Sequence, residues 1–171
     1  MKKYLEYDRA SYRLQFEAFF KTRGSWIYNY LHGSIYGREH GFDITFEKYV
    51  FEPLYDFALC IDNPRQGIQI LEKNDTIVGS VAIVEADEEK AQLRWLILIP
   101  EVRGKGLGRK LVDWAVEFCK EQNYEAIFLW TVSELNAARH IYETMGFRLK
   151  ERNTHEIWEK VLTEEKFELG L

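Results

Sequence analysis

The chain has 171 residues, 46% of them hydrophobic and 15% aromatic, with a formal net charge of −5. This length suits a single domain over residues 1–171 with enough apolar residues for a large core. The negative charge disfavours a dedicated nucleic-acid-binding protein, which would carry a basic surface. The N-terminus has no apolar run of signal-peptide length, and no apolar run in the chain approaches a membrane span, so we expect a cytoplasmic protein without a membrane partner. Cys60 and Cys119 have apolar neighbours, which predicts small core residues in a reducing compartment.

The first part of the chain gives mixed signals. Residues 2–7 alternate weakly, as in a strand, and residues 11–21 carry apolar side chains at helical spacing. Residues 25–31 are rich in aromatic side chains and fit either a helix or a strand. Periodicity alone does not decide between the two.

A helix is predicted over residues 42–57, whose apolar side chains recur at helical spacing. Asp43 or Thr45 is a suitable N-cap, and Pro53 is expected to kink or divide the helix. Aromatic side chains crowd this region and the one before it, and we expect most of them in the core. They are Trp26, Tyr28, Tyr30, Tyr36, Phe42, Phe46 and Tyr49.

Three strands follow, over residues 67–71, 77–84 and 92–99. The pair Asn74–Asp75 fits a tight hairpin turn between the first two strands, and the acidic run 87–89 joins the second to the third. Together these features predict an antiparallel meander.

The pattern changes to helical spacing over residues 107–121. Residues 126–132 are continuously apolar, as expected for a short central strand that is covered on both faces. The stretch from 92 to 132 is therefore a strand–helix–strand unit, and we expect its two strands to pair in parallel.

A second helix is predicted from about residue 136 to residue 145, ended by Gly146 with Phe147 as its apolar contact. Residues 148–149 and 156–162 are expected to close the fold as a hairpin. The whole pattern predicts an α/β fold in layers. Its sheet is mixed and mostly antiparallel, with helices on both faces and one parallel strand–helix–strand crossover.

A glycine-rich, basic turn lies between the third strand and the helix that starts at residue 107. Its glycines let the backbone come close to a ligand, and the first amides and the dipole of the helix favour an anion. Its lysine and arginine side chains make this segment positively charged, although the chain as a whole has a negative net charge. The turn reads Arg103, Gly104, Lys105, Gly106, Leu107, Gly108 and Arg109, and Lys110 follows it.

Three kinds of phosphate-binding turn come into question for this segment. A P-loop is excluded because Gly104–Lys105 is followed by Gly106 and not by a serine or threonine. A dinucleotide-binding turn is disfavoured because the glycine spacing is Gly-x-Gly-x-Gly and the strands before it form an antiparallel meander. The pattern Arg-x-x-Gly-x-Gly, between a strand and a helix, is matched in full by residues 103–108.

That pattern in that context resembles the pyrophosphate loop of the GNAT superfamily of acyl-CoA-dependent N-acetyltransferases. The resemblance is strong over residues 77–147 and extends through 129–131 and 138–147. These stretches look most like the acetyltransferase half of bacterial proteins that fuse it to a MarR-type DNA-binding domain. DNA binding is not carried over, because we find no winged-helix segment.

The resemblance implies acetyl-CoA as co-substrate, with its diphosphate on the main chain and cations of residues 103–109. It also implies that main chain at Leu98 and its neighbours meets the thioester oxygen and the pantetheine amides. Asn136 would contact the pantetheine arm, although Leu135 stands where the family usually has asparagine, and a helix cap is the alternative. Tyr142 would donate a hydrogen bond to the departing thiolate, and a packed core tyrosine is the alternative.

The resemblance places the acceptor pocket beside the N-terminal aromatic residues. Glu85, Glu134 and His155 are candidates for a general base, although each is also a plausible surface residue. No pair of histidines has metal-ligand spacing, so we expect no metal. We expect transfer of acetyl to an unidentified primary amine. The alternatives are a silent acyl-CoA-binding module and a dinucleotide-dependent oxidoreductase. A homodimer formed through an exposed C-terminal strand is also possible.

Overall fold

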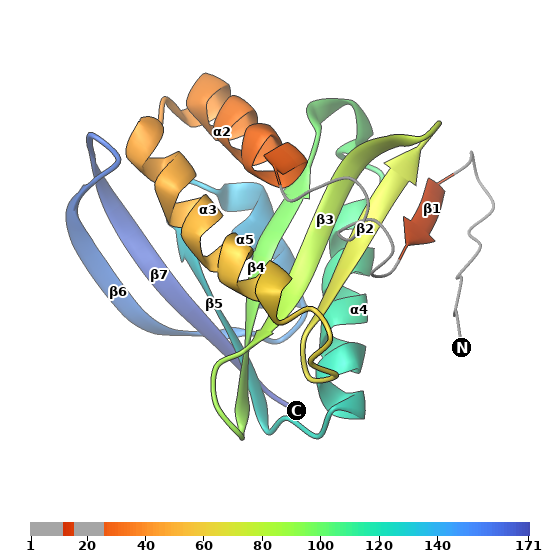
Figure 1. Cartoon of the computed structure of the whole chain (residues 1–171). Coiled ribbons are helices and arrows are strands. Elements are labelled where there is room, and N and C mark those ends of the chain that lie inside the picture. Colours follow the sequence, from red (N-terminus) through yellow and green to blue (C-terminus); the bar gives the residue numbers. More distant parts are fainter. Residues whose placement is uncertain (1–11, 16–25) are drawn as a thin grey trace.

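The computed structural model describes residues 12–15 and 26–171, and seven strands in these residues form one sheet in the order β1-β2-β3-β4-β5-β7-β6 (Figure 1). All neighbouring strands run antiparallel except β4 and β5, which are parallel. The predicted mixed, mostly antiparallel sheet with one parallel crossover is therefore confirmed. The strands are β1 (Tyr12–Gln15), β2 (Gly67–Lys73), β3 (Thr76–Glu85), β4 (Lys90–Leu98), β5 (Ala126–Val132), β6 (Arg148–Ile157) and β7 (Lys160–Gly170).

Helices cover both faces of the sheet. Figure 1 shows α2 and α3 on one face and α4 on the opposite face. The aromatic core under α3 includes Phe46, Leu54 and Phe57. The second core joins α4 and α5 to the other face. None of the described helices has the length and apolar character that crossing a membrane takes. The helices are α2 (Trp26–His40), α3 (Ile44–Leu59), the short 3-10 turn η1 (Pro100–Val102), α4 (Leu107–Glu121) and α5 (Asn136–Thr144).

The N-terminal predictions needed correction. Residues 12–15 form a strand that pairs with β2, so the predicted helix over residues 11–21 is wrong there. The rest of that segment and the predicted strand over residues 2–7 lie outside the described residues. The undecided stretch from residue 25 is helical from Trp26 onward, as part of α2.

Helix α3 begins at the predicted cap and continues past its proline. The Asp43 side chain accepts from the backbone N–H of Thr45 at 3.1 Å, which satisfies one of the free amides at the helix start. Pro53 lies inside one continuous helix, so it does not divide α3. Val50 and Leu54 are buried on either side of it, and this packing outweighs the loss of one helical hydrogen bond.

A bulge in β4 shapes the centre of the sheet. Ser80 of β3 pairs with Ile97 and Ala82 pairs with Arg94, so β4 holds one extra residue between these pairs. Trp95 adopts a φ of 51° at this point. The fully buried Ser80 hydroxyl donates to the Trp95 carbonyl at 3.0 Å, which satisfies a main-chain group at the bulge.

The parallel pair β4–β5 is short. In the described chain, three residue pairs join the strands, from Lys90–Ala126 to Gln92–Phe128. Both strands continue beyond these pairs, so they part on the side where β4 runs into the glycine-rich turn. The parting leaves main-chain groups of β4 without a strand neighbour on its β5 side.

The closing hairpin is longer than predicted. Its turn lies at Trp158–Glu159, both with positive φ, inside the stretch 156–162 that was predicted as one strand. Trp158 is buried and packs against Phe42 and Phe46, with ring centroids 4.8 Å apart in each pair. The hairpin tip therefore belongs to the core under α2 and α3.

The two cysteines differ in their surroundings. Cys119 is fully buried in the core under α4, as predicted. Cys60 is exposed at the end of α3, so its predicted place in the core is wrong. Cys60 is the C-cap of α3, so it follows the last buried turn of the helix, which includes Phe57.

A buried carboxylate ties α5 to the closing hairpin. Glu165 of β7 is fully buried, and its Oε2 lies 2.7 Å from Nε of Arg139 on α5. Its Oε1 lies 2.6 Å from Nη2 of Arg152 on β6. Three elements thus meet at one charge, which two guanidinium groups compensate.

Replacing Glu165 by alanine should lower the free energy of unfolding by about 2–3 kcal/mol, because it leaves two arginines without their shared partner. Urea unfolding followed by circular dichroism measures this loss. The control is Glu168→Ala, which breaks a more exposed 3.3 Å pair with Lys90 and should cost at most about 1 kcal/mol. Equal losses for the two variants would contradict the structural role of Glu165.

Candidate functional site

The glycine-rich turn follows η1 and faces solvent. Gly104 and Gly106 have φ values of 73° and 75°, which residues with a side chain rarely adopt. A Cβ added at either position would meet nothing within 4 Å. The glycines are therefore required by the backbone path, and the space above them is open to a ligand.

Helix α4 presents its amino end to this space. Its N-cap is Gly106, and within the described chain no side chain caps the helix. Leu107 and Gly108 are buried, and a Cβ on Gly108 would lie 2.9 Å from Cδ1 of Ile141 on α5. These two residues can therefore offer only main-chain N–H groups to an anion, with the helix dipole behind them.

The cations of the turn are placed in different ways. Arg103 Nε donates to the Leu98 carbonyl at 2.9 Å, and its Nη1 lies 2.7 Å from Oε2 of Glu39 on α2. Lys105 Nζ donates to the Glu101 carbonyl at 3.0 Å. Arg109 is exposed in the first turn of α4. The contact with Glu39 joins two segments 64 residues apart, and nothing in the sequence indicated it.

A cleft opens where β4 and β5 part. It is lined from α2, α3, β4, β5, α5, β7 and the tip of the closing hairpin. Four of the aromatic residues that the sequence singled out line it; Tyr30 is exposed, and the side chains of Trp26 and Tyr28 are outside the described set. The aromatic lining residues are Tyr36, Phe42, Phe46, Tyr49, Trp95, Trp130, Tyr142 and Trp158.

Tyr142 is held at this cleft by the end of α5. Gly146 has a φ of 94°, its N–H bonds the Glu143 carbonyl at 3.1 Å, and the N–H of Phe147 bonds the Tyr142 carbonyl at 3.0 Å. This is a Schellman ending with the predicted glycine at C′. The Tyr142 ring packs against the buried Phe147 at 5.8 Å between ring centroids. Both the main chain and the ring of Tyr142 are therefore fixed.

Burial controls the chemistry of the cleft tyrosines. It raises the pKa of the Tyr142 hydroxyl far above its ordinary value, and the neighbouring Tyr36 adds to the shift. Burial likewise raises the pKa of Tyr36 to about 12. Both hydroxyls therefore stay protonated at neutral pH and can act as hydrogen-bond donors.

The cleft lining includes an imidazole, a guanidinium and a carboxylate that the sequence did not indicate as site residues. They are His32 on α2, Arg94 on β4 and Glu164 on β7. His32 is buried and stacks on Tyr36, with ring centroids 6.2 Å apart. The available signal was the alternation of β4, which puts Arg94 on the same face as Gln92. Without the position of α3, that face could not be recognised as the cleft side.

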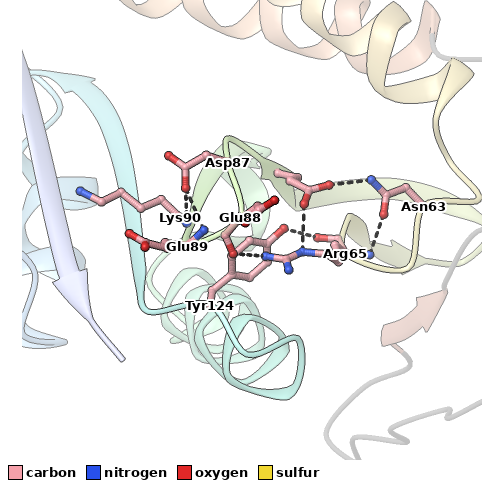
Figure 2. A network of polar contacts seen from close by, with 8 residues as sticks. Asn63, Arg65, Asp87, Glu88, Glu89, Lys90 and Tyr124 are labelled. Carbon is pink, nitrogen blue, oxygen red and sulfur yellow. Dashed lines mark hydrogen bonds and ion pairs between the residues drawn. The ribbon is translucent and has the colours of Figure 1, made fainter.

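The three candidate general bases have different positions. Glu85 Oε1 lies 2.9 Å from Nε of Arg65, outside the cleft lining. Figure 2 shows Arg65 in a network with Asn63, Glu88 and Tyr124, whose hydroxyl donates to the Arg65 carbonyl at 2.8 Å. This network joins the loop before β2, the turn between β3 and β4, and the loop before β5. Glu85 therefore belongs to a structural clamp.

The other two candidates each adjoin a residue that lines the cleft, Leu135 for Glu134 and Glu164 for His155. Glu134 is exposed in the turn between β5 and α5. His155 is also exposed, and its Nε2 lies 3.1 Å from Oε2 of Glu164, which lines the cleft. The carboxylate that reaches the cleft is thus Glu164, with His155 behind it.

Asn136 and Leu98 lie at the ends of their elements. Asn136 is the first residue of α5 and is exposed; the N-cap is Leu135, and within the described residues no side chain caps the helix. The alternative that Asn136 is the helix cap is therefore wrong. Leu98 ends β4, where its carbonyl accepts from Arg103. In the part of the chain that the structure describes, no group of three or more His, Cys, Asp or Glu residues could hold a metal ion.

Comparisons with known proteins agree with this architecture. An uncharacterised N-acetyltransferase of Methanocaldococcus jannaschii is 28% identical over 117 residues, which cover 65% of this chain and 52% of that protein. The chain spans about half the length of the first curated relatives that it matches.

Two solved structures show the same fold. An acetyltransferase from Streptococcus agalactiae has a TM-score of 0.71 at 21% identity, covering 92% of this chain and 98% of that one. A GNAT family acetyltransferase from Elizabethkingia anophelis, with acetyl-CoA bound, has a TM-score of 0.57 at 15% identity. The match covers 70% of this chain and 83% of that one.

The model of the acetyltransferase (GNAT) family matches residues 27–147, which include the glycine-rich turn, the parted strands and Tyr142. This match covers more than half of the 171 residues. The chain therefore belongs to the GNAT family of acetyltransferases.

Proposed function

We propose that this chain transfers acetyl from acetyl-CoA to a primary amine by direct attack of the amine on the thioester. The observation that carries the proposal is the parting of β4 and β5 beside both the open amino end of α4 and Tyr142. Such a gap gives a thioester access to main-chain donors on one side and to an acceptor on the other. We also propose that residues 1–171 act as one domain. Kinship with MarR-fused acetyltransferases and pairing of two copies through β6 stay predictions.

In this proposal the diphosphate of the coenzyme binds above Gly104 and Gly106. The open space over both glycines and the uncapped start of α4 support this role. The main chain of residues 103–109 and the guanidinium of Arg109 would supply donors. Arg103 would reach the diphosphate only by sharing or releasing Glu39, its present partner at 2.7 Å. Asn136 at the start of α5 is retained as a candidate contact of the pantetheine arm.

In the proposed chemistry a neutral amine attacks the thioester carbon, and its nitrogen forms the new bond as the C–S bond breaks. The attacking nitrogen loses one proton and the departing sulfur gains one, so amide and free CoA result. Main chain near Leu98 would stabilise the carbonyl oxygen, and the Tyr142 hydroxyl would donate a hydrogen bond to the sulfur. The raised pKa of Tyr142 favours hydrogen-bond donation over full proton transfer.

Gly106→Val should weaken CoA binding by at least about tenfold, because it strains the turn and fills the space proposed for the diphosphate. Isothermal titration with CoA measures the affinity. The control is Gly41→Ala, at a glycine with a similar φ of 65° outside the turn. It should keep wild-type affinity. If Gly106→Val and the charge reversal Arg103→Glu both bind CoA normally, the turn is not the coenzyme site.

Tyr142→Phe should reduce kcat by at least about tenfold while changing the dissociation constant of acetyl-CoA less than about twofold. The substitution removes the hydroxyl and keeps the ring that packs on Phe147. Thiol release with a panel of amines measures the rate. Tyr124→Phe, which removes a hydroxyl in the distant clamp, should retain kcat. Tight binding without turnover by the wild type would favour a silent acyl-CoA-binding module.

The raised pKa of Tyr142 predicts the alkaline side of the pH profile. A tyrosine with an ordinary pKa of about 10 would lose half of its donor at pH 10. Because burial holds the pKa of Tyr142 above that value, kcat should not fall between pH 7 and about pH 10, where the amine also becomes neutral. Initial rates at saturating substrates test this. The prediction is wrong if kcat of the wild-type protein falls near pH 10 and kcat of Tyr142→Phe does not.

A further inference from the structure

Arg94 brings a positive charge to the acceptor side of the cleft. It lies on β4 beside the bulge, and its guanidinium carbon is 5.6 Å from the ring centroid of Tyr49 and 5.3 Å from that of Trp95. Its Nη1 donates to Oε1 of Gln92 at 3.3 Å. All three of these neighbours are uncharged.

Four other arginines among the described residues each form an ion pair with a carboxylate. Among the described residues, Arg94 contacts cleft rings and an amide but no carboxylate within ion-pair distance. Burial also lowers the pKa of Arg94. A partly desolvated guanidinium without a counter-ion costs free energy, and an anionic ligand that binds it bidentately recovers much of this cost. The arginines with carboxylate partners are Arg65, Arg103, Arg139 and Arg152.

Glu164 supplies the opposite charge in the same cleft. Its side chain is 18% exposed and pairs with the more exposed His155 at 3.1 Å. Among the described lining residues it is the sole carboxylate, as Arg94 is the sole guanidinium. Tyr49 lies in the field of both: burial raises its pKa, Arg94 lowers it and Glu164 raises it. The cleft thus holds one guanidinium and one carboxylate, and both affect the pKa of Tyr49.

We propose that the acceptor is an amino acid, bound with its carboxylate on Arg94, its amino group toward Glu164 and its side chain against the aromatic walls. This inference rests on the proposed acetyltransferase function and names its substrate class. A diamine or polyamine fits less well, because its second ammonium would meet Arg94. The two charges would also orient the ligand, since a zwitterion reversed in the cleft would face like charges at both ends.

Matched ligand pairs test the proposal. Leucine is compared with 3-methylbutylamine and phenylalanine with 2-phenylethylamine, so that each pair differs by the carboxylate. Affinity is measured with CoA present through tryptophan fluorescence, because Trp95, Trp130 and Trp158 line the cleft; kcat/KM is measured by thiol release from acetyl-CoA. In at least one pair, the amino acid should bind at least about tenfold more tightly than its amine and have a kcat/KM at least about tenfold higher.

Arg94→Gln should reduce this preference to about twofold or less, because the amide carries no charge. Arg148→Gln, which changes an exposed arginine on β6, should keep the full preference. The proposal is overturned if the amines bind as well as the amino acids, if no member of any pair binds, or if Arg94→Gln keeps the preference. If amino acids bind through Arg94 but no acetyl transfer occurs, the enzymatic proposal fails and the acceptor site stands.

Discussion

The structure depends on one constraint in the middle of its sheet: β4 and β5 pair over a few residues and then separate. A parallel pair normally continues as long as both strands do, because each unpaired main-chain group costs free energy. Here the bulge at Trp95 changes the path of β4, and the buried Ser80 hydroxyl satisfies the Trp95 carbonyl. The sheet stays intact through β3 on one side and β7 on the other. A gap can therefore exist at its centre without loss of the core.

The elements around the gap are tied to one another by contacts between distant segments. Arg103 connects the glycine-rich turn to Glu39 on α2, and Lys160 at the hairpin tip donates to the His40 carbonyl at the end of the same helix. Glu165 joins α5 to the hairpin through Arg139. Helix α2 thus contacts the proposed coenzyme turn at one residue and the closing hairpin at the next. A ligand that displaces Glu39 from Arg103 would remove a contact of α2, the helix that also contributes His32 and Tyr36 to the cleft lining.

Sequence reasoning succeeded where local rules decide the structure. Helix 107–121 and strand 126–132 have their predicted bounds, and Gly146 ends α5 as its position indicated. It failed where tertiary contacts decide. Strand β6 is exposed along nearly its whole length, so it shows no alternation, and the turn at Trp158–Glu159 lacks the glycine that marks most such turns.

The same distinction holds for the candidate site, and it explains why the glycine-rich turn is easier to recognise in the sequence than the cleft. A diphosphate-binding turn is made of consecutive residues, so its glycines and cations appear together in the sequence. The proposed acceptor side is made of single residues from separate elements, such as Arg94, Tyr49 and Glu164, which only the packing of α3 and β7 brings together. A family can keep one reaction by keeping the continuous turn. It can change its acceptor by changing isolated residues on a face that the sheet already presents.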